Sequence, residues 1–174
     1  MMIEATLCFL VWGNPPEKLL LGYKKVGFGK GKYGGVGGKI ERGECAVCAA
    51  AREVYEETGI RVREVDLRQM GHLTFVFPYK PEWSHLVYVF VADKWDGQPA
   101  ESREIKPTWV PVDAIPYQAM WDDCHYWLAH ILDGKPVKAR FTFKADNDTV
   151  DTAQVDPWNG ADKLTYEIVK PESF

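Results

Sequence analysis

The sequence predicts a single α/β domain in which helices cover both faces of a mixed β-sheet. Short apolar runs of strand type alternate along the chain with two amphipathic segments of helical type. Residues 86–92 (LVYVFVA) are apolar at nearly every position, which is typical of a strand buried on both faces. The length of 174 residues suits one domain with a full hydrophobic core.

The first half of the chain predicts two strands, a loop and a helix, in that order. The strands are expected at residues 6–12 and 19–23, where apolar residues cluster. Residues 27–38 contain seven glycines and predict a loop. The helix is expected from about residue 44 to residue 58, because this segment is rich in alanine and Gly59 follows it as a C-cap.

The second half predicts further strands and a second helix. We expect strands at residues 70–77, 86–92, 108–112 and, with the alternating pattern of an edge strand, 140–144. Polar residues predict a loop at 93–106, and an amphipathic pattern predicts a helix at 121–132. Because the chain then becomes polar, we expect the domain to span residues 1–156 and a tail to span residues 157–174.

Composition and charge are those of an ordinary soluble protein. Hydrophobic residues make up 46% of the chain and charged residues 26%, with a net charge of −4. This balance favours neither a stable nucleic-acid partner nor a membrane surface. The N-terminal segment has an early acid and no basic region, and no apolar run approaches the ~20 residues of a membrane span, so we expect a cytoplasmic protein.

Four cysteines are expected to be reduced thiols in that compartment: Cys8, Cys45, Cys48 and Cys124. Cys45 and Cys48 form a CxxC motif, but no second pair follows and no histidine lies near in sequence. Packing on a helix flank is therefore favoured over zinc or redox chemistry.

Three acidic residues stand close together on the first predicted helix. Glu53, Glu56 and Glu57 are three and four positions apart, so a helix carries them on roughly one face. Like charges at that spacing repel by about 0.2–0.5 kcal/mol per pair, and stability gains nothing from them. A bound cation would turn the repulsion into attraction, and hard oxygen donors suit Mg²⁺, with Mn²⁺ as an alternative.

These glutamates belong to a segment, residues 38–60, that resembles the Nudix box, G-x5-E-x7-R-E-U-x-E-E-x-G-U with U aliphatic. All nine specified positions are filled, namely by Gly38, Glu44, Arg52, Glu53, Val54, Glu56, Glu57, Gly59 and Ile60. The resemblance implies a Nudix α/β/α sandwich with a mixed β-sheet. It also implies hydrolysis of a nucleoside diphosphate that is linked to another group.

The resemblance assigns roles to the acidic residues. In the family, carboxylates at the positions of Glu53, Glu56 and Glu57 hold divalent metals on the phosphates, together with a backbone carbonyl that is Gly37 here. Glu104 matches an acidic residue outside the box that helps to bind metal or to activate water. Any of these four carboxylates is a candidate for the base that takes the proton of the attacking water.

The resemblance also assigns the residues around the carboxylates. Arg52 pairs in the family with Glu44 and with the catalytic carboxylates, and it orients them. Glycine at Gly38, as at Gly37, allows the backbone to approach the site closely. Four lysines are candidates to place positive charge near the phosphates. Lys24 and Lys39 are preferred over the loop lysines Lys30 and Lys32.

A second layer of resemblance covers about residues 5–156. The segments LLLGYKKVGFGKGKYGGVGGK, MGHLTFVF, AESREIKPTWV and IPYQAMWDDCHYW are similar to the MutT-like branch that acts on oxidised purine nucleoside triphosphates. This similarity implies cleavage of 8-oxo-dGTP and related nucleotides to the monophosphate and pyrophosphate. The implied partner is a small-molecule nucleotide, and the sequence carries no signal for an oligomeric state.

The same similarity implies a purine pocket. Phe28, Phe75, Phe77 and Trp121 match residues that line the base site, where aromatic faces stack on a base. Thr6 and Lys24 match positions at the edge of that pocket. The four histidines, His72, His85, His125 and His130, match no ligand pattern and are expected to be structural.

The chain departs from this branch at two places. Animal members carry a base-binding asparagine where Gly34 stands. They also carry an acidic pair before the last helix, and the alignment places Asp123 and Cys124 there, although another register makes Asp122 and Asp123 the pair. Hydrolysis of purine triphosphates is therefore expected more firmly than a strict preference for the oxidised base.

Two alternative functions remain open at this point. One is another Nudix substrate, either an RNA 5′ end or a nucleotide sugar, and the acidic net charge speaks against RNA. The other is a nucleotide sensor without turnover. A complete set of box carboxylates disfavours the sensor.

Overall fold

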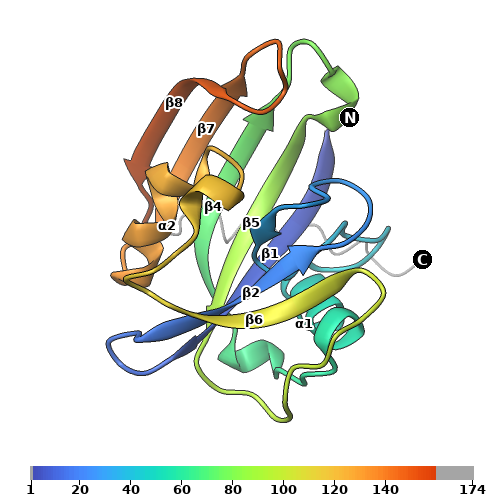
Figure 1. Cartoon of the computed structure of the whole chain (residues 1–174), viewed down its shortest axis with the longest axis vertical. Helices are drawn as coiled ribbons and strands as arrows, with labels where there is room; N and C mark the ends of the chain where they lie inside the picture. Colours follow the sequence, from blue (N-terminus) through green and yellow to red (C-terminus); the bar gives the residue numbers. More distant parts are fainter. Residues whose placement is uncertain (1, 160–174) are drawn as a thin grey trace, which may run out of the picture.

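The computed structural model describes residues 2–159, which form eight strands and two α-helices (Figure 1). The strands are β1 Ile3–Trp12, β2 Lys18–Lys24, β3 Tyr33–Gly34, β4 Arg68–Val76, β5 His85–Ala92, β6 Ile105–Pro111, β7 Val137–Phe143 and β8 Val150–Pro157. The α-helices are α1 Ala46–Thr58 and α2 Cys124–Leu132. Three short 3₁₀ turns complete the described part, at Glu64–Asp66, Pro81–Trp83 and Tyr117–Ala119.

The strands form one mixed sheet, as the sequence predicts. Their order is β3-β2-β1-β5-β4-β7-β8, and β6 pairs with β2. The β1/β5 and β4/β7 pairs are parallel, whereas the other pairs are antiparallel. The apolar strand β5 lies between β1 and β4, so the prediction that it is central is confirmed.

The sheet separates two hydrophobic cores. Successive side chains of a strand point to opposite faces, so β1 contributes Phe9 to one core and Leu10 to the other. The α2-side core contains Trp127 of α2, and the α1-side core contains Val54 of α1. Figure 1 shows α1 near β1 and β6, and α2 near β7 and β8. The expected arrangement of helices on both faces of the sheet is confirmed.

Helix α1 begins and ends at residues that the sequence singles out. Cys45 is the N-cap, and its Sγ accepts a hydrogen bond from the Cys48 backbone N–H at 3.1 Å. Gly59 follows the helix with φ of 78°, a conformation that glycine adopts without steric cost. A disulfide joins Cys45 to Cys48, so the expectation of reduced thiols at this pair is wrong. The first helical turn brings their Cα atoms to 5.1 Å, within the range that a disulfide spans.

Two strands lie where the sequence predicts none: β3 falls in the predicted loop, and β8 falls almost entirely in the last residues of the predicted domain, before the predicted tail. Strand β3 pairs only two residues inside the glycine-rich segment, too few to give a pattern. Strand β8 covers the outer edge of β7, so β7 is not the edge strand that its alternation suggested. Most side chains of β8 are exposed, so its backbone pairing with β7 is what defines it as a strand.

The end of the described chain remains packed against the fold. Pro157 ends β8, and Trp158 is buried and donates its backbone N–H to the Pro136 carbonyl. Residues 160–174, which make up most of the predicted tail, lie outside the described residues. Among the helices of residues 2–159, none is long and apolar enough to cross a bilayer.

Burial of α2 predicts how the fold responds to truncation. Leu128 is fully buried in the α2-side core, so Leu128→Ala should lower the free energy of unfolding by about 2–5 kcal/mol. Val65→Ala is the control, because Val65 is 81% exposed and its truncation should change stability by less than about 0.5 kcal/mol. Urea unfolding measures both variants. Equal stability of the two would contradict the placement of α2.

Candidate active site

A cavity of about 660 Å³ lies between helix α1, which carries the clustered glutamates, and the α2 side of the molecule. Acidic residues line one end of it, among them Glu53, Glu56 and Glu57 of α1. Aromatic rings line the other end, among them Phe28 and Trp121. One cavity therefore joins a charged region to an apolar region.

Three elements bring the acidic end together. Helix α1 supplies its glutamates, the segment before β6 supplies Glu104, and Lys24 ends β2, which pairs with β6. The Lys24 Nζ lies 3.4 Å from Glu104 Oε2 and 3.9 Å from Glu57 Oε1. The structure thus brings Glu104, which is 47 positions after Glu57 in the sequence, into the same cluster.

Arg52 holds the acidic residues in place. Its Nε and Nη2 donate to the two carboxylate oxygens of Glu44 at 2.6 and 2.9 Å, in the bidentate geometry that suits a guanidinium. Its Nη1 donates to Glu53 at 2.9 Å and to Glu56 at 3.1 Å. Its Nη2 also donates to the Lys39 backbone carbonyl at 3.2 Å. The geometry fits the orienting role that the resemblance implies for Arg52, with Glu44 as its salt-bridge partner.

Burial makes the carboxylates of this cluster costly to ionise. The pKa of Glu57 is raised to about 8, first by its burial and then by a hydrogen bond with Glu104. Burial also raises the pKa of Glu53, although the hydrogen bond from Arg52 acts in the opposite direction. In contrast, the hydrogen bonds from Arg52 lower the pKa of Glu44. A negative charge is therefore favoured at Glu44 and disfavoured at the half-buried Glu53 and the buried Glu57.

Two glycines let the backbone pass close to this cluster. A Cβ at Gly37 would lie within 3 Å of the Thr6 backbone carbonyl, so the chain cannot keep this path with a larger residue. A Cβ at Gly38 would meet the carboxylate of Glu53, at 2.5 Å from Oε1. Gly37 needs glycine because of this close approach to backbone atoms, whereas at Gly38 the contact is with the end of a flexible side chain.

The donor chemistry of the cluster fits a hard divalent cation. All its side-chain donors are carboxylate oxygens, and the partly buried Glu53 and the buried Glu57 have raised pKa values, so a cation would relieve a real electrostatic cost. Within residues 2–159, however, no three acidic or histidine side chains are already arranged around one point. Arg52 accounts for this, because it engages both Glu53 and Glu56. A cation must compete with that guanidinium for their oxygens.

The aromatic end of the cavity is built from a loop, a strand and the segment before α2. Phe28, in the glycine-rich loop, stacks on Trp121 with ring centroids 5.0 Å apart and an interplanar angle of 20°. Phe77 contacts both rings edge-to-face. Phe75 and Phe77 are buried in the α2-side core and also line the cavity. The four predicted pocket aromatics thus meet in one place.

The three residues of the two proposed acidic registers lie in different surroundings. Asp123 and Cys124 line the cavity, whereas Asp122 accepts a hydrogen bond from the Val150 backbone N–H at 2.8 Å and fixes the start of β8. Asp123 is 3% exposed and accepts a hydrogen bond from Trp127 Nε1 at 2.7 Å. Its burial raises its pKa to about 6, despite that hydrogen bond.

The remaining predicted residues also lie at the cavity. Lys39 and Thr6 line it, and the Thr6 hydroxyl is buried without a hydrogen-bond partner among the described residues. Lys32 reaches across the opening, with its Nζ 2.8 Å from Asp148 Oδ1 and 4.9 Å from the ring centroid of Trp121. Of the four lysines considered from the sequence, Lys24, Lys32 and Lys39 line the cavity.

Sequence reasoning missed several cavity residues. Trp83 and His85 line the cavity outside every segment that carries the resemblance, and Trp127 lines it from the end of such a segment without an assigned role. The buried tryptophan at position 127 was assigned only to a helix face. A buried tryptophan needs a hydrogen-bond partner for its Nε1–H, so the aspartates a few residues before it in the sequence could have indicated that Trp127 is buried beside them.

Comparison with known proteins gives consistent results. The sequence model of the NUDIX domain matches residues 4–131. An oxidized purine nucleoside triphosphate hydrolase from Mus musculus is 40% identical over 173 residues, which is 99% of this chain and 100% of that protein. A protein of the same name from Danio rerio is 40% identical over 143 residues, which is 82% of this chain and 90% of that protein.

The fold has a solved counterpart. The crystal structure of a MutT protein from Bacillus halodurans superimposes with a TM-score of 0.76 and covers 89% of this chain and 98% of that one. At 24% identity, this likeness supports the fold alone.

Titration of Asp123 yields a stability prediction. Its folded pKa of about 6 lies above the unfolded value of about 4, so the wild type should be most stable, relative to Asp123→Asn, below pH 4. That advantage should fall by up to about 3 kcal/mol as the pH rises through 6, because the buried carboxyl must then ionise or stay protonated at a cost. Urea unfolding of both proteins from pH 4 to pH 8 measures the difference. A difference that stays constant with pH would contradict the assignment.

Proposed function

The chain belongs to the NUDIX domain family, and we propose that it hydrolyses oxidised purine nucleoside triphosphates to the monophosphate and pyrophosphate. Two relatives that are 40% identical, over 99% and 82% of this chain, carry the name oxidized purine nucleoside triphosphate hydrolase. More distant relatives carry the names 8-oxo-(d)GTP phosphatase and 8-oxo-dGTP diphosphatase. These names agree on the substrate class.

One observation carries the proposal to this chain. The acidic cluster and the aromatic rings line a single cavity, so a nucleotide can place its phosphates at one end and its base at the other. A phosphate-only substrate would leave the aromatic end unexplained. A base-binding protein without turnover would leave the buried carboxylates unexplained, since they cost stability.

The acidic end supplies the hydrolytic part of the site. We propose Mg²⁺, or Mn²⁺, as the cofactor, held by Glu53, Glu56, Glu57 and Glu104 with the Gly37 carbonyl. When bound, such a cation neutralises phosphate charge and acts as a Lewis acid. Lys24 sits between Glu57 and Glu104 and adds positive charge at the same end.

The chain itself directs the proton and the oxygens during the reaction. Water attacks a phosphorus of the triphosphate, the bond from that phosphorus to the oxygen bridging the α- and β-phosphates breaks so that monophosphate and pyrophosphate separate, and a carboxylate of the cluster takes the proton of the water. Glu57 suits this step in part, because a carboxylate with a raised pKa is a stronger base once it is ionised. Arg52 does not touch the reacting atoms; it fixes Glu53 and Glu56 through its Nη1.

The aromatic end supplies base binding. Phe28 and Trp121 offer ring faces for stacking, which is worth about 1–3 kcal/mol per base in nucleic-acid systems. Asp123, with its pKa of about 6, can present either a proton donor or an acceptor to the base near neutral pH. The free nucleotide pool is the expected source of substrate, so the proposal places the protein in the cytoplasm.

Neutralising one glutamate tests the proposal. Glu57→Gln should lower kcat for 8-oxo-dGTP hydrolysis in Mg²⁺ by about 10²–10⁴-fold. The fold should persist, since Gln has nearly the same shape and removes a buried charge. Glu64→Gln is the control, because Glu64 is exposed and lies outside the cavity. Pyrophosphate release and the melting temperature measure both variants.

The same assay compares nucleotides with the wild-type protein. Pyrophosphate should appear from 8-oxo-dGTP at a higher kcat/KM than from dGTP, ATP or ADP-ribose. Absence of turnover with every nucleotide, in either Mg²⁺ or Mn²⁺, would refute the proposed activity. Equal kcat/KM for 8-oxo-dGTP and dGTP would remove the preference for the oxidised base.

A substitution in the backbone approach tests the position of Glu53. Gly38→Ala places a Cβ against the Glu53 carboxylate, which must then shift at the end of a flexible side chain. We expect kcat to fall by about tenfold or more, because small misplacements at a reacting centre are expensive, while the melting temperature stays near that of the wild type. Normal kcat in a variant that folds normally would show that the position of Glu53 is unimportant.

A further inference from the structure

His85 is a polar residue on the cavity wall that the proposed reaction does not use. It begins β5 and pairs directly with Phe75 of β4 across the sheet. Directly opposed residues of paired strands present their side chains on the same face. His85 therefore lies on the face of the sheet that carries Phe75, and both residues line the cavity.

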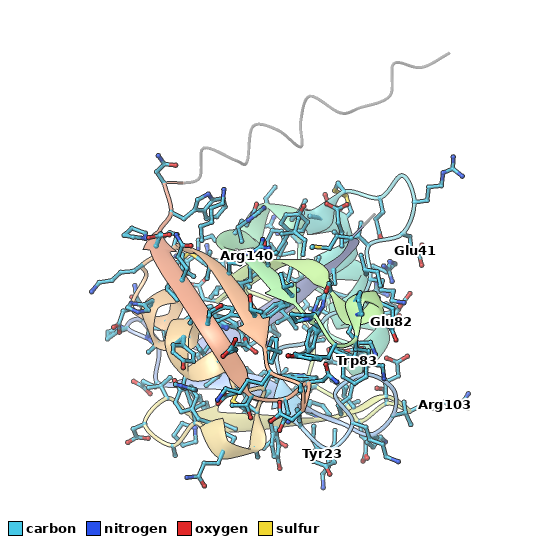
Figure 2. The ribbon with its side chains drawn as sticks, turned by 90° about the horizontal axis from the view of Figure 1, so that it is seen from above. Tyr23, Glu41, Glu82, Trp83, Arg103 and Arg140 are labelled. Carbon is cyan, nitrogen blue, oxygen red and sulfur yellow. A yellow bond between two sulfur atoms is a disulfide. The ribbon has the colours of Figure 1, made fainter. Side chains whose placement is uncertain are left out.

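One hydrogen bond fixes the tautomer of this imidazole. The Nδ1 atom lies 2.6 Å from the backbone carbonyl oxygen of Trp83. Trp83, which Figure 2 labels, ends the short turn before β5. A carbonyl oxygen can only accept, so Nδ1 carries the hydrogen and donates it. Burial lowers the pKa of His85, which favours the neutral ring. In that tautomer, Nε2 carries a lone pair and acts as an acceptor.

This acceptor is free to meet a ligand. Across residues 2–159, Nε2 has no hydrogen-bond partner, and it is not among the unpartnered polar atoms that are sealed from solvent. The ring is held rigidly, because it stacks on Phe75 with centroids 5.0 Å apart and contacts the edge of Phe28 at 5.6 Å. A fixed acceptor thus stands among apolar rings.

Such surroundings make one hydrogen bond selective. A polar atom in an apolar site costs free energy when a bound ligand removes its water without offering a partner. A ligand with a hydrogen-bond donor at that point avoids the cost, and one without the donor does not. Phe28 belongs to both the His85 contacts and the Trp121 stack, so the acceptor lies beside the expected base position.

We propose that His85 determines base specificity, with Nε2 accepting a hydrogen bond from an N–H group of the bound purine. This inference rests on the proposed function and adds a residue to it. The candidate donors are the 2-amino group of guanine and the N7–H that oxidation at C8 creates. A histidine serving only to fill the core would not favour one of these donors over another.

Substrates that differ by one donor test the proposal in the full-length protein. The panel is 8-oxo-dGTP, dGTP, 8-oxo-dITP and dITP, in which the oxo compounds add N7–H and the inosine compounds lack the 2-amino group. His85→Phe keeps an aromatic ring and removes the acceptor. We expect it to lower kcat/KM by about tenfold for substrates that carry the recognised donor, and to leave the others within about threefold.

Ratios between substrates decide the outcome, since a structural role lowers all four values by the same factor. A change of about fivefold or more in the ratio for 8-oxo-dGTP against dGTP, or for dGTP against dITP, supports the proposal. Uniform losses, or no loss, overturn it while the wild-type activity stands. Wild-type protein that cleaves none of the four nucleotides would instead refute the proposed function and this inference with it.

A second variant covers the case in which His85→Phe does not fold. His85→Gln keeps a side-chain acceptor and a donor for the Trp83 carbonyl, so it should retain substrate ratios within about threefold of the wild type. His85→Leu has neither group, and its substrate ratios are compared with those of His85→Gln once both variants are shown to have the same melting temperature. Identical ratios for the Gln and Leu variants would overturn the proposal.

Discussion

The site depends on one guanidinium that is shared among several acceptors. Arg52 uses three nitrogen atoms to reach Glu44, Glu53, Glu56 and the Lys39 carbonyl. This sharing joins α1 to the segment that passes through Gly38, and it fixes glutamates that would otherwise repel. A lysine cannot copy it, because an ammonium group lacks the planar arrangement of donors. The acidic cluster exists in this form because of that one side chain.

The two ends of the cavity impose opposite physical demands on one fold. The acidic end holds the buried carboxylate of Glu57, whose burial raises its pKa to about 8. The aromatic end holds apolar side chains such as Phe77, which is fully buried. The sheet reconciles these demands by keeping separate cores on its two faces. Helix α1 brings the acids from one side of the sheet, while β4, the glycine-rich loop and the segment before α2 bring the aromatic rings. Lys32, through its contacts with Asp148 and Trp121, ties the glycine-rich loop across the opening.

Sequence reasoning succeeded where a pattern reflects one dominant force. The box helix follows from its alanines and Gly59, and β5 follows from its continuous apolar run. It failed where tertiary pairing decides the structure. Strand β8 is polar because its side chains face solvent, so only its pairing with β7 reveals it. The Cys45–Cys48 disulfide depends on the first turn of α1 and was predicted as two thiols.

The site shows the same division. A spacing motif grouped Glu53, Glu56 and Glu57, and the structure places them on one side of α1. No local pattern could show whether Asp122 or Cys124 lies beside Asp123 at the cavity, because Asp122 is engaged by a long-range hydrogen bond from the Val150 backbone N–H. His85 carried no sequence signal, since its importance lies in which ring nitrogen faces the cavity. The two-core arrangement has an evolutionary consequence. Substitutions among the aromatic rings beneath α2 can change which nucleobase binds. They can do so without altering the residues on the opposite layer that cleave the bond.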